Sequence, residues 1–273
     1  MKAPFPWYGG KSSIAESVWP LFAGCSNYIE PFAGSLAMLL SRPTPVGVEL
    51  VNDNDHHIIN FWRSMRLYPK RFADLLDYPI SSAECSARSG RPADRNRIMA
   101  EMDYCDVEAA ACWVYLVCAL PGNSWKSQTA RKNHAPKVLE NFGSRGIFST
   151  PPEALAALSE RLRRVKIHCG DWLQSLGNGS LLHKGKSAVF LDPPYEGTSG
   201  QYTDSSVRTS DVRQWAIEHG HHVCVALCGH ESEHGPHMPK DWAVFAWSRF
   251  NGPTRHDERV WTSPACSKQV TLC

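Results

Sequence analysis

Short apolar runs alternate with amphipathic segments in the first and last parts of the chain. The apolar runs with the length and composition of buried strands are 27–32, 46–51, 165–168, 187–191 and 222–227. Segments with apolar residues three and four positions apart predict helices at 12–22, 36–40, 56–67, 152–164 and 210–219. This order predicts parallel strands joined by helical crossovers, with a closing antiparallel pair at 242–247 and 258–262.

The alternation stops between residues 69 and 150. This stretch holds an arginine-dense segment at 88–97, an apolar helix at 107–120 and a loop at 123–146 rich in glycine, asparagine and basic residues. A structureless loop of such length is unusual in a compact domain unless it is functional. We therefore predict a main domain of residues 1–68 and 151–273, and an inserted, mainly helical and loop subdomain of residues 69–150.

The composition indicates a folded protein and not a largely disordered one. Hydrophobic residues make up 42% and charged residues 21%, while 29 basic and 27 acidic residues leave a net charge of only +2. Neither the 10 cysteines nor the 12 histidines have the spacing of a metal site, so no metal is expected. The chain shows no secretory signal core and no apolar run of membrane-spanning length, so we expect a cytoplasmic, reduced protein.

The tetrapeptide Asp192-Pro193-Pro194-Tyr195 directly follows the predicted strand 187–191. In open α/β sheets, ligands bind at this end of the strands. The prolines restrict the backbone, so they hold the carboxylate, a carbonyl and the aromatic ring in a fixed relation. That set suits an exocyclic amine on a flat ring. The alternative is an ordinary turn followed by a core tyrosine.

A glycine turn, Glu30-Pro31-Phe32-Ala33-Gly34-Ser35, follows the first strand and leads into a helix. Such a turn lets a ligand lie against the backbone at a helix N-terminus. Glu30 favours a cationic or hydroxyl-bearing ligand over a pyrophosphate. The absence of a Walker lysine and of a full GxGxxG motif disfavours ATP and NAD.

Two aspartates end further strands. Asp53 could accept both hydroxyls of a ribose; its alternative role, capping the next helix, fits Asp55 better. Asp171, followed by Trp172, could accept a hydrogen bond from an adenine amino group, or be a turn residue. With the aromatic-glycine-lysine motif at residues 7–11, which alone could be a flexible arm, these elements outline a nucleoside pocket beside an aromatic slot.

In their order, PWYGGK, EPFAGS, NDND and DPPY resemble the motifs of the Dam-like alpha group of DNA adenine-N6 methyltransferases. The closing segment 257–264 is similar to that family's acidic C-terminal strand, so the resemblance spans nearly the whole chain outside the middle insertion. One departure is Leu36, where the family usually has another glycine. The resemblance implies an α/β fold with a Rossmann-like methyltransferase sheet and helices on both faces.

The resemblance also implies S-adenosylmethionine as the methyl donor. The cofactor-binding residues that it implies are Trp7, Tyr8, Gly9, Gly10, Lys11, Glu30, Pro31, Phe32, Gly34, Ser35, Asp53, Asp171, Trp172 and Asp192. Lys11 would lie near the methionine moiety. Asp192, Pro193, Pro194 and Tyr195 would form the target-adenine site, where Asp192 and the Pro193 carbonyl accept the amine hydrogens and Tyr195 stacks on the ring.

The insertion matches the family's target-recognition region in its place along the chain. Its candidate DNA-binding residues are Arg88, Arg91, Arg95, Arg97, Asn123, Lys126, Gln128, Arg131 and Lys132. Arginine and lysine suit phosphates, whereas arginine, asparagine and glutamine can read base edges; the alternative is a solvated charged face. Tyr202 lies in a loop expected to order over the flipped base. The expected partner is double-stranded DNA, the expected state is a monomer, and a cognate restriction endonuclease is compatible with this activity.

Two further functions stay open at this point. One is the same chemistry on RNA adenine or on cytosine N4. The other is a catalytically inactive DNA-binding homologue that keeps the fold, for which Leu36 is the only support in the sequence.

Overall fold

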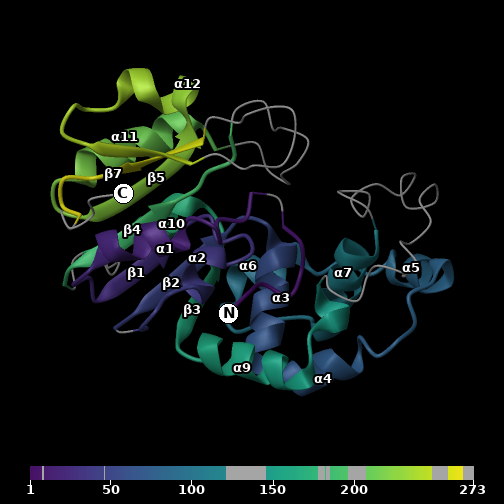
Figure 1. Ribbon diagram of the computed structural model, residues 1–273. Helices are drawn as coiled ribbons and strands as arrows, with labels where there is room; N and C mark the ends of the chain where they lie inside the picture. The colour runs from purple at the N-terminus through teal and green to yellow at the C-terminus, as the bar shows by residue number, and fades with distance from the viewer. Residues whose placement is uncertain are drawn as a thin grey trace. The chain divides into compact units, whose positions relative to one another are not determined.

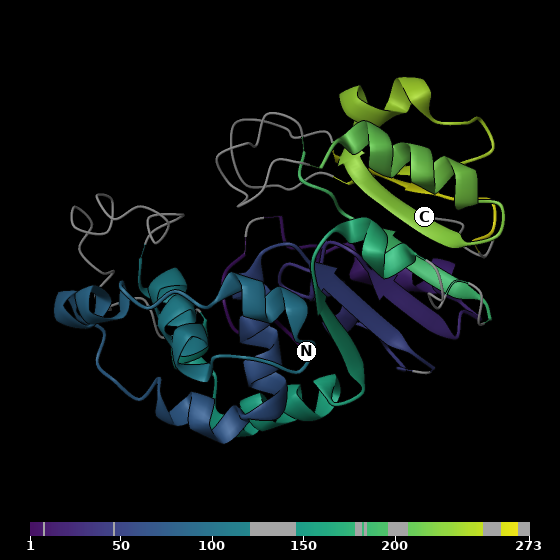
Figure 2. The same ribbon diagram turned by 180° about the vertical axis from the view of Figure 1, so that it is seen from behind.

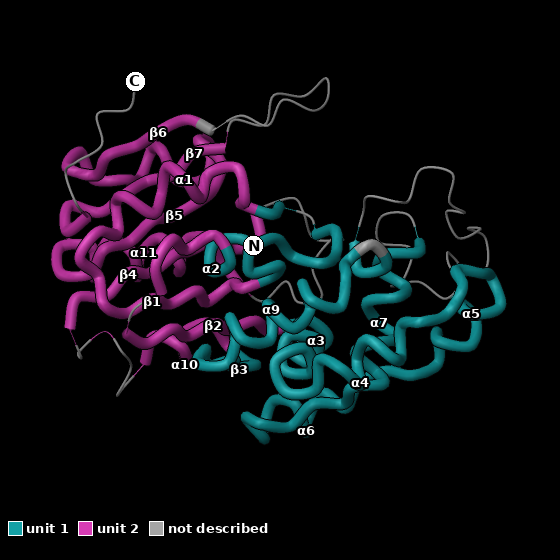
Figure 3. The backbone as a smooth tube through the Cα atoms, turned by 60° about the horizontal axis from the view of Figure 1, so that its bottom comes forward, with its two compact units in different colours: residues 1–10, 34–40, 55–170 teal, residues 11–33, 41–54, 171–273 magenta. Residues whose placement is uncertain are grey.

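The computed structural model describes residues 1–7, 9–45, 47–120, 146–177, 182, 185–195, 207–247 and 258–266 (Figure 1). These residues form two compact units, coloured separately in Figure 3. Unit 1 comprises 1–10, 34–40 and 55–170, and unit 2 comprises 11–33, 41–54 and 171–273. We describe each unit by itself.

The strands form a seven-stranded sheet in the order β3-β2-β1-β4-β5-β7-β6. Their bounds are Asn27–Glu30 (β1), Glu49–Asp53 (β2), Val165–Cys169 (β3), Ser187–Leu191 (β4), Cys224–His230 (β5), Ala243–Trp247 (β6) and Glu258–Thr262 (β7). β1 pairs in parallel with β2 and β4, and β4 with β5. β7 is antiparallel to both β5 and β6, so the predicted closing antiparallel pair is confirmed, as are the parallel directions of β1, β2, β4 and β5.

Both units contain helices. In unit 2 they are Ala15–Val18 (α1), Trp19–Phe22 (η1), Trp172–Leu176 (α10), Thr209–His219 (α11), Glu231–His234 (α12) and Gly235–His237 (η5). In unit 1 they are Ala37–Leu40 (α2), His56–Leu67 (α3), Pro69–Asp74 (α4), Ser82–Arg88 (α5), Arg95–Ala100 (α6), Val107–Ala119 (α7), Ile147–Ser149 (η3) and Pro152–Leu162 (α9).

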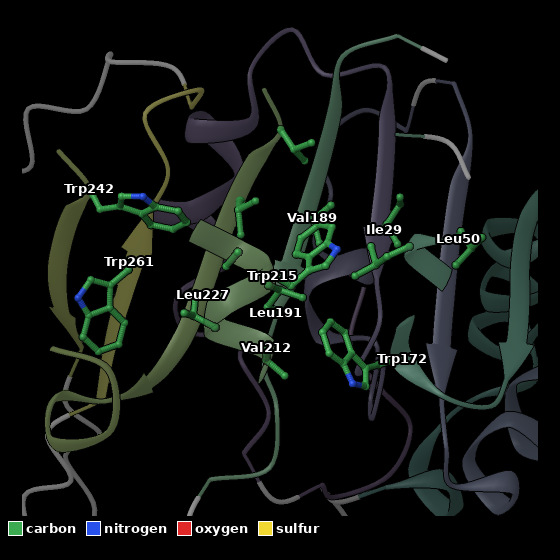
Figure 4. Close-up of a cluster of buried hydrophobic side chains, with 14 residues drawn as sticks. Ile29, Leu50, Trp172, Val189, Leu191, Val212, Trp215, Leu227, Trp242 and Trp261 are labelled. Atoms are coloured by element: carbon green, nitrogen blue, oxygen red, sulfur yellow. The ribbon is translucent and has the colours of Figure 1, made fainter. Parts of the chain in front are cut away.

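Both faces of the unit 2 sheet are covered, as predicted. Successive strand residues point to opposite faces. Ile29, Val189 and Leu227 pack on one face with residues of α10 and α11 (Figure 4). Figure 2 shows α11 in front of β5, whereas in Figure 1 it lies behind. Tyr28, the neighbour of Ile29, packs instead against Trp19 of η1, with ring centroids 4.8 Å apart.

The parallel strands of unit 2 bring the predicted motifs to one edge of the sheet. β1 ends at Glu30, β2 ends at Asp53, and Asp192 directly follows β4. β5 ends at the same edge with His230. The Rossmann-like arrangement therefore gathers acidic side chains at the strand ends, where open α/β sheets bind ligands.

Helix α3 lies at the centre of unit 1. The carboxylate of Asp55 accepts a hydrogen bond from the backbone N–H of His57 at 2.9 Å, so Asp55 caps the helix as predicted. Arg63 is fully buried and donates to four backbone carbonyl oxygens, those of Ile167, Ile98, Glu101 and Tyr104. This one side chain therefore joins α3 to β3 and to the segment of α6.

Candidate functional site

Asp192 lies in a largely buried charge network in unit 2. Nζ of Lys11 is 2.8 Å from Oδ1 of Asp192, and the side chains are 4% and 19% exposed. The hydroxyl of Tyr195 donates to the same oxygen at 3.1 Å. Within the described part of the chain, no hydrogen bond engages Oδ2 of Asp192. Two donors thus fix one carboxylate oxygen of Asp192.

The ammonium group of Lys11 interacts with more than one acidic side chain. Burial disfavours the charged form of Lys11, but the negative charge of Asp192 and Glu258 outweighs it, so the pKa of Lys11 is raised above its usual value. Oε2 of Glu258 is 4.0 Å from Nζ. The ammonium also lies 5.1 Å from the ring centroid of Tyr195. The structure therefore places Lys11 at the predicted amine-binding tetrapeptide.

Tyr195 stays a hydrogen-bond donor at all ordinary pH values. Its burial, and then the charge of Asp192, raise the pKa of its hydroxyl well above the usual value. The ring packs against the imidazole of His230, with centroids 4.7 Å apart and an interplanar angle of 68°. Sequence reasoning missed His230, although its place near the end of an apolar run was a usable signal.

The turn after β1 is anchored to β2. Nδ2 of Asn52 donates to the carbonyl of Pro31 at 3.1 Å, and the backbone N–H of Ala33 donates to the carbonyl of Asn52 at 2.8 Å. Glu30, buried at the end of β1, accepts a hydrogen bond from the hydroxyl of Tyr28 at 2.9 Å. The main-chain path that follows Glu30 is thereby fixed before any ligand binds.

Aromatic and acidic groups flank this turn in unit 2. The ring of Phe32 stacks on Trp172 at a centroid distance of 5.9 Å. Asp53 is half-buried at the end of β2. Oδ1 of Asp171 accepts from the backbone N–H of Leu173 at 2.8 Å, so Asp171 caps α10. A cofactor role for Asp171 stays a prediction, and the cap leaves one of its oxygens for it.

Unit 1 holds the other motif residues. Gly34 has a φ of +46°, and a Cβ there would lie 2.8 Å from Nε1 of Trp7, so only glycine fits. Gly10 and Ser35 lie next to each other, since a Cβ on Gly10 would be 3.6 Å from Oγ of Ser35. The ring N–H of Trp62 donates to the Gly34 carbonyl at 2.9 Å. Tyr8 lies outside the described residues.

Leu36 adopts the backbone conformation of a glycine. Its φ is +54°, and among the described residues it is the only non-glycine with positive φ. The side chain is fully buried, which holds leucine in a conformation that costs roughly 1–2 kcal/mol. The turn thus keeps a glycine-like path at the position where the sequence departs from the resembled family.

Two of the predicted DNA-binding arginines have clear internal partners. Arg88 donates to Glu84 at 3.0 Å and to the Leu75 carbonyl at 3.1 Å, and its guanidinium lies 4.5 Å from the ring centroid of Tyr115. Arg91 forms an ion pair with Glu108. The guanidinium of Arg88 therefore serves packing within unit 1.

The remaining predicted DNA contacts are exposed or not described. Arg97 is half-exposed and pairs with Glu101 at 2.9 Å, and Arg95 is exposed at the start of α6. The residues that lie outside the described ranges are Asn123, Lys126, Gln128, Arg131, Lys132 and Tyr202.

Other features do not coincide with these motifs. A cavity of about 450 Å³ in unit 2 is lined by Trp19, Phe22, Arg42 and other residues, and includes none of the predicted site residues. Within the described ranges, no group of three or more His, Cys, Asp or Glu could hold a metal ion. No helix in the same ranges is both long enough and apolar enough to cross a membrane.

Comparison with known proteins agrees with the motif order. Residues 7–87 match the model of the family described as D12 class N6 adenine-specific DNA methyltransferase. The chain is 24% identical over 246 residues to the Retron Ec67 DNA adenine methylase of Escherichia coli, covering 83% of this chain and 77% of that protein. A putative methyltransferase of Escherichia coli, yhhF, aligns in structure with a TM-score of 0.38 and 11% identity, covering 95% of this chain and 90% of that one.

The family match and the retron relative both support DNA adenine methylation. The matched range 7–87 includes the aromatic-glycine-lysine motif, the glycine turn and Asp53. The relative extends the similarity over most of the remaining chain.

Proposed function

We propose that this chain, an adenine-specific DNA methyltransferase, uses S-adenosylmethionine to methylate N6 of an adenine that is flipped out of the DNA duplex. The observation that carries the proposal is the network around Asp192. One carboxylate oxygen is held by Lys11 and Tyr195, and the other is free of hydrogen bonds from the described residues.

The charges at the strand ends fit a cationic methyl donor. Glu30, Asp53 and Asp192 meet at one edge of the sheet in unit 2, and Lys11 is engaged by Asp192. Excess negative charge there favours a sulfonium and an ammonium over a phosphate ligand. Asp53 would hold the ribose hydroxyls. The Phe32–Trp172 pair offers a flat apolar surface for an adenine.

Further cofactor contacts belong to the same proposal. They are assigned to Trp7, Tyr8, Gly9, Gly10, Pro31, Gly34, Ser35 and Asp171. S-Adenosylmethionine supplies an electrophilic methyl group when bound, so neither a metal nor a covalent enzyme intermediate is required.

The target amine needs orientation because its lone pair is delocalised into the adenine ring. Oδ2 of Asp192 and the carbonyl of Pro193 would accept the two amine hydrogens and draw the nitrogen towards tetrahedral geometry. Tyr195 would stack on the ring, and Pro194 keeps the loop rigid. Holding the two reactants in line can contribute up to roughly 7–11 kcal/mol in favourable cases.

DNA recognition is assigned to the inserted subdomain of residues 69–150, and methyl transfer to a catalytic domain of residues 1–68 and 151–273. Flipping the adenine out costs a few kcal/mol, which binding to the duplex must supply. Among the described arginines, Arg95 and Arg97 are exposed on α6 and suit phosphates.

We also propose that the enzyme is a monomer, acts in the cytoplasm where its DNA substrate lies, and can act with a cognate restriction endonuclease.

Methyl transfer from labelled S-adenosylmethionine to unmethylated duplex DNA tests the function. Nucleoside digestion should give N6-methyladenine, whereas N4-methylcytosine or label in RNA would point to the two related chemistries. Asp192→Asn should lose turnover, because the asparagine amide has one acceptor oxygen where the carboxylate has two. DNA binding should stay within about twofold of the wild type. Absence of label in every nucleoside, together with no calorimetric binding of the cofactor, would favour the inactive DNA-binding homologue.

A further inference from the structure

The turn where β5 passes directly into α12, at residues 229–231, lies beside Tyr195. His230 is the last residue of β5, and its imidazole meets the Tyr195 ring edge-to-face at 4.7 Å. In the β5–β7 pair His230 lies opposite Glu258, the acid beside Lys11. This turn is therefore next to the charge network around Asp192.

This turn is held in place before any substrate binds. The backbone N–H of His230 donates to Oε2 of Glu233 at 3.0 Å, which closes a capping box on α12. Arg213 donates to the Glu233 carbonyl at 2.6 Å, from helix α11. Beneath the turn His234 is fully buried and fills the space over Gly229, where a Cβ would come within 2.2 Å of its ring. His230 thus has little freedom to move.

The hydrogen bond of the Tyr195 hydroxyl does not restrain rotation of the ring about its long axis. The phenolic oxygen lies on the axis that runs from Cβ through the ring, so rotation about that axis does not move it. The hydrogen bond to Asp192 therefore fixes the tip of the side chain but not the plane of the ring. A contact with the ring itself is needed to fix its plane, and His230 makes one.

We propose that His230 is a positioning residue that sets the ring plane of Tyr195, and through it the orientation of the stacked target adenine. The inference rests on the proposed function, because it gives Tyr195 the role of stacking on the base. An edge-to-face contact of this kind needs a flat ring at position 230, not a charge or a hydrogen bond.

The test compares steady-state methylation of duplex DNA by the full-length wild type, His230→Ala and His230→Phe. His230→Ala should lower kcat about three- to tenfold, the size expected from losing one aromatic pair, with KM for S-adenosylmethionine unchanged. His230→Phe should restore kcat to within about twofold. His222→Ala, at an exposed histidine, is the matched control and should behave as the wild type.

Each other outcome overturns the inference. Wild-type kcat in His230→Ala would show that the contact between His230 and Tyr195 is not needed for turnover. An equal loss in the Ala and Phe variants would assign the effect to the imidazole nitrogens. If His230→Ala does not fold, His230→Gln keeps the bulk without the ring and should show the same loss. A wild type that methylates no DNA adenine refutes the proposed function itself, whereas an active wild type with unaffected variants refutes only the role of His230.

Discussion

Lys11 and Tyr195 both bind Oδ1 of Asp192, so the direction of Oδ2 depends on them. The resemblance implies a place for Lys11 near the methionine moiety of the cofactor, and that place stays a prediction. No local pattern could predict its contact with Asp192, because that contact depends on which strands are neighbours in the sheet. The position of Asp192 directly after β4 could be predicted, because the prolines after it end the strand locally.

Replacing Lys11 with methionine separates these two roles. Methionine keeps the bulk but leaves Asp192 and Glu258 without the cation between them, so kcat should fall roughly 100-fold through misplacement of Asp192. The free energy of unfolding should fall by about 3–5 kcal/mol. Because the pKa of Lys11 is raised, its stabilising contribution is complete below 10.5, declines as pH rises from there through the folded pKa, and is absent above it.

Kinetic constants of Lys11→Met and of the control Lys2→Met, at an exposed lysine, provide the measurement. An increase confined to KM for S-adenosylmethionine, with kcat unchanged, would instead support the role at the methionine moiety.

At the scale of elements, the sequence predicts those that are bounded by strong local signals. The strand 187–191 and the helix 56–67 have the predicted bounds, because each is a buried run with clear ends. The predicted helix 12–22 divides into α1 and η1, where Pro20 lacks the N–H that an α-helix needs. β2 begins at Glu49 instead of Val46, since Gly47 has φ +69° and packs so closely on Ser26 that a Cβ would clash.

The α12 helix carries a histidine that couples folding to pH. Both ring nitrogens of His234 are buried without hydrogen bonds in the described part of the chain. Burial, and then the nearby Arg213, His230 and His237, lower the pKa of His234 from 6.5 to about 4. Between these values the unfolded chain binds more protons, so the free energy of unfolding should fall as pH drops from 6.5 to 4 and level off below.

Urea unfolding at pH 7, 5.5 and 4.5 checks this expectation. His234→Leu, which cannot take up a proton, should lose less stability over that range than the wild type, by up to about 3 kcal/mol. His222→Leu, at an exposed site, should keep the wild-type slope. Equal slopes in all three proteins would show that other groups dominate the acid response.

At the scale of the whole molecule, the net charge of +2 offers no general attraction to DNA, so binding must rely on local groups of basic residues. On α6, Arg95 and Arg97 are exposed, whereas Arg88 is engaged within unit 1. If Arg95 and Arg97 bind phosphates, replacing both with alanine should weaken binding to all duplex sequences alike. The slope of log K against log salt should then flatten by about 0.9 for each phosphate that is no longer neutralised.

Fluorescence anisotropy with labelled duplex DNA between low and moderate salt measures that slope. Arg163→Ala removes an exposed arginine that is also paired with an acid, but it lies outside the inserted subdomain, so it should leave the slope unchanged. An unchanged slope in the double variant would move the DNA surface away from α6. The residues of 121–145 would then be the next to replace, because the basic residues of that segment include Lys126, Arg131 and Lys132.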